Sequence, residues 1–280
     1  MSPCERLDEA RRAEACCTRA GAAMKLKYAW MCAVLGAGLM VGCGESSEQE
    51  EPTVIETDAG DEDVEQIGEV DDRDALAELP CGEEMLADWP LQEEVSDASV
   101  EITEEGGVFT ATLDASAGGT QGAASNPFVY LNLTTGEKAE LNDVEAALSE
   151  GWHLGFKRFI IRSNSGDSGP GGVLVTKVSN TTFEEVDSVP GNPEAYRTDD
   201  TYDASCTPEL DPIGTPMTAF NYLNLDNPSG SQSWYSYGGG ISPVAGDVYV
   251  VRDPEAGVAY KLEITGWSDG EFELRWAELN

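Results

Sequence analysis

Short runs of apolar and β-branched residues, separated by Gly, Asn and Asp, dominate the sequence from about residue 80 onward. The runs 108–114 and 128–133 each lead into a Gly-containing turn and predict strands. Residues 152–161 alternate with the period of two that is typical of a strand, with one bulky face. Residues 141–150 form the one segment that predicts a short helix.

The second half of the chain has the same character. Residues 220–225 repeat the pattern of 128–133 and predict another strand, either in a second related subunit or as an independent strand of similar composition. Residues 247–252 and 258–265 flank a five-residue turn and predict a β-hairpin. A closing strand is indicated by alternation of Phe272, Leu274 and Trp276. These patterns predict an all-β domain over residues 80–280, an antiparallel β-sandwich or half-barrel.

The N-terminal region has the pattern of an export signal. From Met24, two lysines precede an apolar run that is too short for a permanent membrane span. We therefore expect residues 1–42 to be a signal-peptide region, with translation starting at Met24. Residues 40–43 (MVGC) resemble a bacterial lipobox, which implies cleavage before Cys43 and a lipid on its thiol. An ordinary secretory signal with an incidental cysteine is the alternative.

Charge separates the next segment from the domain. The chain has 53 acidic and 16 basic residues, and Arg73 is the only cation between residues 45 and 79. That segment contains no aromatic residue, so we expect residues 43–79 to be a disordered acidic tether that begins at the lipidated cysteine. A net charge of -37 with no basic stripe excludes a nucleic-acid partner. The predicted location is the outer membrane or cell surface, through a lipid anchor.

Cysteine usage fits an oxidising compartment. Once residues 1–42 are removed and Cys43 carries lipid, only Cys81 and Cys206 remain. Two cysteines in an exported chain predict one disulfide, and two free buried thiols are the alternative.

Three stretches, in order, resemble the HmuY family of bacterial surface lipoproteins that bind haem. They are 130–136 (YLNLTTG), 152–166 (WHLGFKRF, then IRSNSG), and 234–262 (WYSY, then VYVVRD and GVAYKL). The resemblance covers roughly residues 125–280. It implies an all-β fold of HmuY-like type, with ligand held between loops at one end of the sheets.

Haem-binding members of the family use a pair of axial side chains, often two histidines, one of them after the WYSY-like segment. Here residues 238–243 contain no His, Met, Tyr or Cys, and His153 is the only histidine of the chain, so a bis-His site is excluded. His153 and Met217 are the candidate iron ligands. The alternatives are a hydrogen-bonded strand histidine and a methionine that fills a packing gap.

Trp234, Tyr235 and Tyr237 lie beside a run of three glycines, where aromatic side chains can form the wall of a flat hydrophobic site. The same cluster can equally be a strand end packed into the core. Three aspartates at 199, 200 and 203 are expected to lie in a solvated loop, with a Ca²⁺ site as the alternative. No metal other than haem iron is expected.

These observations predict a surface lipoprotein that captures haem, as its cofactor, or a similar flat ligand and passes it to an outer-membrane importer. The alternative is a structural or interaction lipoprotein of the same fold that has lost the cofactor site. We expect no enzymatic activity, because the single histidine has no nucleophile motif to serve.

Overall fold

The computed structural model describes residues 71–88, 91–116, 125–211, 214–225, 233–237 and 239–279. The chain divides into two units, residues 1–64 and 65–280, and every described residue lies in the second. The predicted signal region, Cys43 and the tether as far as residue 70 lie outside the described residues. Within the described part, no helix is long and apolar enough to cross a membrane.

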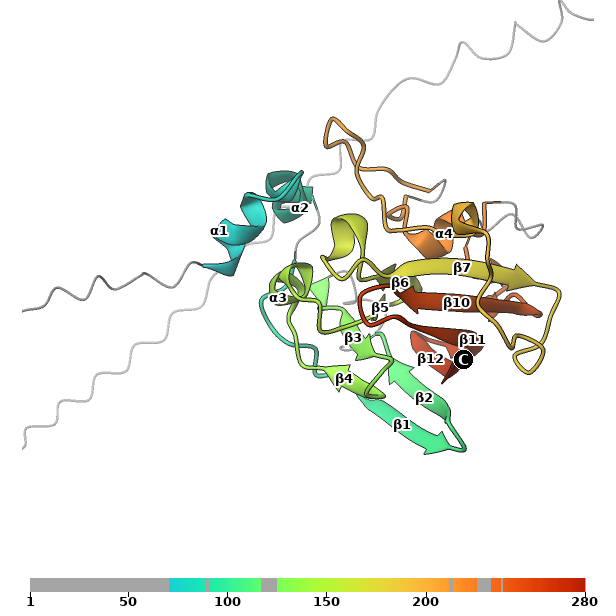
Figure 1. Ribbon diagram of the computed structural model, residues 1–280. Helices are drawn as coiled ribbons and strands as arrows, with labels where there is room; N and C mark the ends of the chain where they lie inside the picture. Colours follow the sequence, from blue (N-terminus) through green and yellow to red (C-terminus); the bar gives the residue numbers. More distant parts are fainter. Residues whose placement is uncertain are drawn as a thin grey trace, which may run out of the picture. The chain divides into compact units, whose positions relative to one another are not determined.

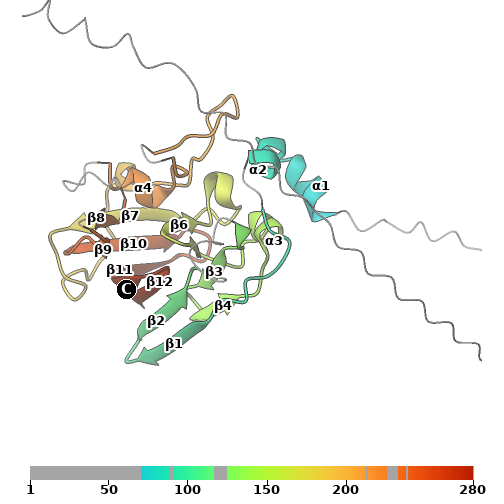
Figure 2. The same cartoon turned by 180° about the vertical axis from the view of Figure 1, so that it is seen from behind.

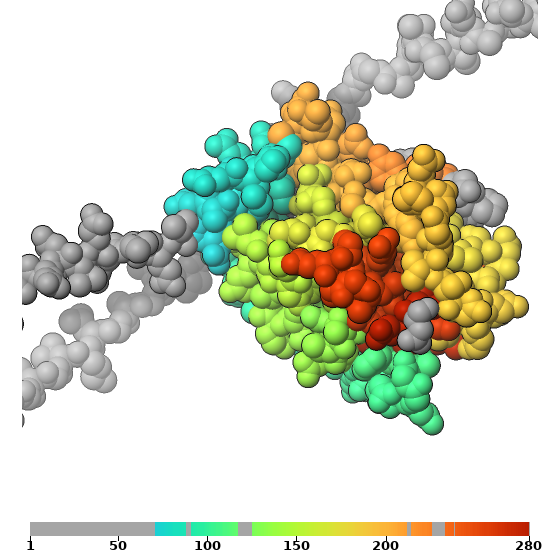
Figure 3. Space-filling view, viewed as in Figure 1, coloured from blue at the N-terminus to red at the C-terminus, as the bar shows by residue number. Residues whose placement is uncertain are grey.

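The largest element is a six-stranded antiparallel sheet (Figure 1). Its order is β1 (Val100–Glu105), β2 (Val108–Asp114), β12 (Glu271–Glu278), β11 (Val258–Ser268), β10 (Asp247–Asp253) and β7 (Leu174–Ser179). β10 and β11 form the predicted hairpin, and Phe272, Leu274 and Trp276 are all buried on one face of β12. The β1–β2 hairpin projects from the edge of the sheet, and most residues of β1 are exposed (Figure 3).

A second, four-stranded antiparallel sheet packs on the first (Figure 2). Its order is β4 (Glu137–Ala139), β3 (Val129–Asn132), β5 (Leu154–Lys157) and β6 (Ile160–Ser163), and β8 (Tyr235–Tyr237) pairs separately with β9 (Ile241–Pro243). The main core lies between the two sheets and takes side chains from both, including Leu131, Phe156, Leu262 and Trp276. The predicted all-β, antiparallel sandwich is therefore confirmed.

Short helices cover the edges of this sandwich. The predicted helix is α3 (Asp143–Leu148), and it begins with a capping box between Asn142 and Glu145. Ala146 of α3 packs with Phe128, Tyr130 and Trp152 on the outer face of the four-stranded sheet. Two helical turns, η2 (Gly166–Ser168) and η3 (Pro193–Ala195), lie in the loops around β7.

The prediction of one strand over 152–161 was wrong, because the chain reverses at Arg158 and Phe159 to form the β5–β6 hairpin. Arg158 has a positive φ of 56°, which no glycine or asparagine signals in the sequence. Distant groups hold the turn instead. The Trp234 and Trp267 indole N–H groups donate to the carbonyls of Phe159 and Arg158, and the Arg158 N–H donates to the Ala115 carbonyl.

The prediction of a strand over 220–225 was also wrong, because the chain forms helix α4 (Ala219–Tyr222). The buried Asp199 carboxylate accepts a hydrogen bond from the first helical N–H, that of Ala219, at 2.8 Å. After the helix, the Asn224 side chain donates to the Phe220 carbonyl. An apolar run of this length fits either a strand or a short helix, and these contacts select the helix.

Ordered structure begins before residue 80. Helix α1 (Asp72–Ala77) lies inside the segment predicted to be tether, and its Leu76 is fully buried in a small cluster with Met85 and Val144. Helix α2 (Gly82–Asp88) follows. The predicted disulfide is present between Cys81 and Cys206, with a Cα–Cα distance of 5.1 Å. It joins this N-terminal helical pair to the loop 203–207.

Candidate functional site

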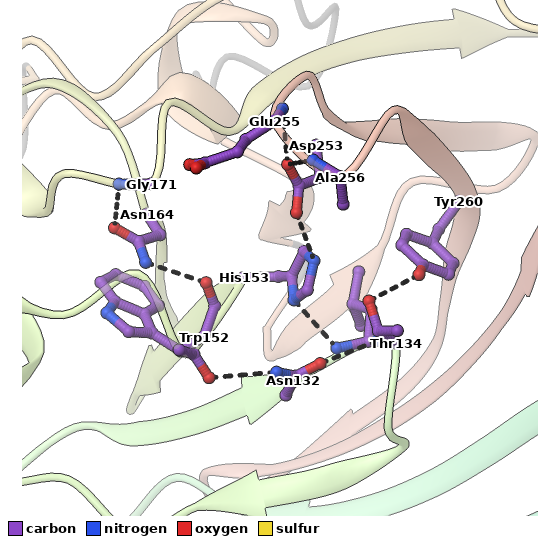
Figure 4. A network of polar contacts seen from close by, with 12 residues as sticks. Asn132, Thr134, Trp152, His153, Asn164, Gly171, Asp253, Glu255, Ala256 and Tyr260 are labelled. Atoms are coloured by element: carbon purple, nitrogen blue, oxygen red, sulfur yellow. Dashed lines mark hydrogen bonds and ion pairs between the residues drawn. The ribbon is translucent and has the colours of Figure 1, made fainter.

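His153, the candidate iron ligand, is buried at the start of β5 and is 4% exposed. Its Nδ1 accepts a hydrogen bond from the backbone N–H of Leu133 at 3.2 Å, which places the ring proton on Nε2. Nε2 faces the Asp253 carboxylate at 3.5 Å, and the ring meets Tyr260 edge-on (Figure 4). Burial lowers the pKa of His153, and the nearby Asp253 carboxylate only partly opposes this. The imidazole is therefore neutral at neutral pH, and Nε2 forms no hydrogen bond although the Asp253 carboxylate faces it.

The partners of His153 are fixed in turn. Asp253 accepts the N–H groups of Glu255 and Ala256, both at 2.9 Å, and so shapes the β10–β11 turn. Thr134, next to Leu133, shares a 2.7 Å hydrogen bond with the Tyr260 hydroxyl (Figure 4). The histidine thus joins the 131–134 segment to the β10–β11 turn.

Asn164, which sequence reasoning missed, extends this arrangement. Its amide donates to the Trp152 carbonyl and its oxygen accepts the Gly171 N–H, both at 2.9 Å (Figure 4). The same amide donates to the Ser149 carbonyl at 2.9 Å. A Cβ on Gly171 would lie 2.8 Å from the Asn164 amide, so glycine is required for this close approach. We call His153, Asn164 and Asp253 with these partners the histidine network.

The aromatic cluster divides into core and surface. Trp234 is buried in the main core and donates from its indole to the Phe159 carbonyl at 2.8 Å. Tyr235 is also buried, with its ring 5.8 Å from that of Phe159. Tyr237 is 71% exposed. The structure therefore matches the core alternative for the first two residues and leaves Tyr237 as an accessible aromatic face.

Met217 is half-buried in the irregular segment that enters α4. Its N–H donates to the Glu209 carbonyl, and the neighbouring Pro216 carbonyl accepts from the Asn221 side chain. The Asn221 side-chain oxygen accepts from the Ser233 hydroxyl at 3.0 Å. These bonds connect the Met217 segment to the strand that carries Tyr237. His153 belongs to the separate histidine network, and none of the contacts described here joins it to the Met217 segment.

Asp199, expected in a solvated loop, is instead completely buried, so that expectation was wrong. Its carboxylate accepts from the Ser163 N–H and hydroxyl, the Ser168 hydroxyl and the Ala219 N–H, at 2.7 to 3.0 Å. Burial raises its pKa to about 6, although these donors oppose the shift. It connects β6 to α4. The described residues contain no group of three or more His, Cys, Asp or Glu side chains that could hold a metal ion.

The cavities on the described surface include one that the histidine network borders. It has a volume of about 220 Å³ and is lined by Glu150, Trp152, Gly171, Asp253 and Glu255, among others. Two others are lined in part by residues 71–73 and by residues 79–85. None of these three is lined by Met217 or Tyr237.

Comparison with known protein families adds one finding. The family model described as "HmuY protein" matches residues 124–276, which run from just before β3 to within β12 and so include strands of both main sheets. No curated protein matches the chain.

Proposed function

Because the chain belongs to the HmuY family, we propose that it is a lipid-anchored surface protein that captures haem or a similar flat hydrophobic ligand. It would deliver this ligand to an importer in the outer membrane. The family match over residues 124–276 is the observation that carries the proposal. The lipobox-like sequence before Cys43 supports the anchor, and the proposed role is binding rather than catalysis.

The candidate ligands differ in how well they suit haem iron. His153 does not fit in this arrangement, because the residue is 4% exposed, Nδ1 already accepts a backbone N–H, and the unpaired Nε2 points at the Asp253 carboxylate 3.5 Å away. Met85, the other methionine of the domain, is buried in the apolar cluster with Leu76. Met217 is only half-buried, and a thioether is a known axial ligand. We therefore assign any iron contact from this set to Met217, with the exposed ring of Tyr237 as a stacking surface.

The second candidate function, a cofactor-free interaction protein of the same fold, has its own support. The only histidine acts in the histidine network, and both Trp234 and Tyr235 are core residues. Loss of a cofactor site in this way would leave the β-sandwich intact.

A haemin titration tests the proposal. The full chain with Cys43→Ser, which cannot carry lipid, is titrated with haemin and followed by absorbance in the ferric and ferrous states. A saturable, shifted Soret band at one equivalent is the expected result. A spectrum that stays that of free haemin in both states would overturn haem capture and favour the interaction protein.

A further inference from the structure

Two cationic side chains lie on the outer face of the four-stranded sheet, the face that α3 covers. In the β5–β6 pairing, Arg162 lies opposite Gly155 and Lys157 lies opposite Ile160. Gly155 is also paired with Tyr130 of β3. The absence of a side chain at Gly155 leaves room for the Tyr130 ring, since a Cβ there would lie 3.0 Å from it. Both cations are more than nine-tenths buried, with 8% of Arg162 and 9% of Lys157 exposed.

The two charges meet at the ring of Phe128. The Arg162 guanidinium carbon lies 4.3 Å from the ring centroid, and the Lys157 ammonium nitrogen lies 5.3 Å from it. Such cation–π contacts hold the head groups in place but accept none of their N–H hydrogens. We call Lys157 and Arg162, together with the Phe128 ring that both contact, the cation pair.

The donors of this region lack acceptors. Arg162 Nε is buried and has no hydrogen-bond partner, and the same is true of the side-chain nitrogen of Asn126, two residues before Phe128. Among the described residues, neither Lys157 nor Arg162 forms an ion pair with a carboxylate. Buried polar groups normally find partners, so an unpaired guanidinium N–H at this ring, beside a second buried cation, is unusual.

The nearby carboxylate is already occupied. Asp143 accepts the Phe128 N–H at 2.8 Å, the Tyr130 hydroxyl at 3.0 Å and the Gln92 N–H at 3.1 Å. It therefore has little remaining capacity for Lys157 or Arg162. Desolvation lowers the pKa of Lys157, and the Asp143 charge opposes this only in part. Two buried cations thus face a single carboxylate whose hydrogen bonds are made elsewhere.

We propose that the cation pair binds a compact oxyanion beside Phe128, either inorganic phosphate or the carboxylate group of a larger organic ligand. An oxyanion supplies the two things that the region lacks, which are negative charge and acceptor-only oxygen atoms. Guanidinium and ammonium groups bind such anions through charge-assisted hydrogen bonds. This site does not depend on haem capture, because it uses none of the candidate iron ligands.

Thermal unfolding of the full chain with Cys43→Ser tests the site. Phosphate and propionate are titrated separately, each against chloride at equal ionic strength. Three proteins are compared: the parent, Arg162→Met, and the matched control Arg252→Gln, which removes an exposed cation. An anion that binds only the folded state raises the midpoint temperature in proportion to ln(1 + [anion]/Kd).

The expected result is a specific rise in the parent and in Arg252→Gln that is reduced at least threefold in Arg162→Met. A rise with phosphate alone identifies an inorganic anion, and a rise with propionate alone identifies a carboxylate ligand. Equal shifts in all three proteins, or none, would overturn the proposal, since salts stabilise folded proteins generally. If Arg162→Met does not fold, anion titration of the parent followed by NMR of its arginine Nε–H groups tests the site instead. One signal that moves and saturates supports the site, and unchanged signals contradict it.

Discussion

The histidine network and the cation pair both involve the β5–β6 hairpin, but they differ in how far their polar and charged groups are compensated by the protein. In the histidine network, Asn164 and Asp253 are hydrogen-bonded within the protein, and the unpaired Nε2 of His153 has the Asp253 carboxylate 3.5 Å away. In the cation pair, Arg162 keeps a buried Nε–H without an acceptor, and among the described residues neither cation forms an ion pair with a carboxylate. The first region therefore holds the fold together, and the second has unused capacity to bind.

This difference matters for how function is inferred from residue type. A lone histidine is the chemically most attractive residue of the chain, but its surroundings make it part of the scaffold. Lys157 and Arg162 look like ordinary surface cations in the sequence, and only their burial against one occupied carboxylate sets them apart. Whether a polar group is already satisfied is thus more informative than its identity.

The largest expected effect comes from Asn164→Ala. The change leaves the Ser149 and Trp152 carbonyls and the Gly171 N–H without their partner inside the protein. We expect the free energy of unfolding to fall by about 3–5 kcal/mol in urea denaturation, because buried groups lose hydrogen bonds without gaining water. The control Asn192→Ala removes an exposed cap of η3 and is expected to cost about 1 kcal/mol or less. Equal losses in the two variants would mean that the network is not a scaffold.

Asp199→Asn tests a buried carboxylate that accepts hydrogen bonds from Ser163 of the β5–β6 hairpin. Its pKa is about 6 in the fold, against 3.8 for an ordinary aspartate, so the folded state holds a proton that the unfolded chain has released. Stability from this group is therefore present below pH 4 and is lost as pH rises to about 6, by roughly 3 kcal/mol in total. The free energy of unfolding of the parent, relative to Asp199→Asn, should fall over that range.

The exposed Asp203 is a control, because its pKa is shifted in the direction opposite to that of Asp199. Backbone N–H groups of Thr207 and Ser205 lower its pKa, so its contribution is present at neutral pH and is lost as pH falls. Parent and Asp199→Asn curves that run parallel between pH 4 and 6 would show that the buried carboxylate does not titrate as described.

His153→Phe has a smaller effect. At pH 7.5 the variant leaves the Leu133 N–H without an acceptor, and we expect a loss of about 1–2 kcal/mol in urea denaturation. Because the pKa of His153 is lowered in the fold, the parent loses stability as pH falls below about 6.5, where the unfolded chain takes up the proton first. The difference between parent and variant should therefore shrink on acidification. A difference that grows instead would place a charged imidazole in the network.

The sequence predicted those parts of the fold that local pattern determines. The β10–β11 hairpin and the buried face of β12 follow from alternation and a polar turn, and the disulfide follows from having only two cysteines in the domain. The turn at Arg158 and helix α4 could not be predicted, because Trp234, Trp267 and Asp199 stabilise them from far along the chain. The cation pair was missed for the same reason, since it depends on the strand register between Lys157, Arg162 and Phe128.

The smallest expected effect on stability is that of Met217→Leu. This substitution conserves volume at a half-buried position, so we expect a change of less than about 1 kcal/mol in the free energy of unfolding. It removes the thioether without disturbing the hydrogen bonds of the Met217 backbone. Comparing Met217→Leu with His153→Phe therefore distinguishes a residue that binds ligand from one that stabilises the fold. A urea denaturation curve of each variant measures its free energy of unfolding.

A haemin titration of three proteins, the parent, His153→Phe and Met217→Leu, tests most directly whether binding lies outside the histidine network. If the parent binds haemin, we expect His153→Phe to keep the Soret shift and to bind with an affinity within about threefold of the parent's. Met217→Leu should lose the shift or weaken binding at least tenfold. Loss of the Soret shift in folded His153→Phe, with Met217→Leu unchanged, would contradict the account and make the histidine the iron ligand.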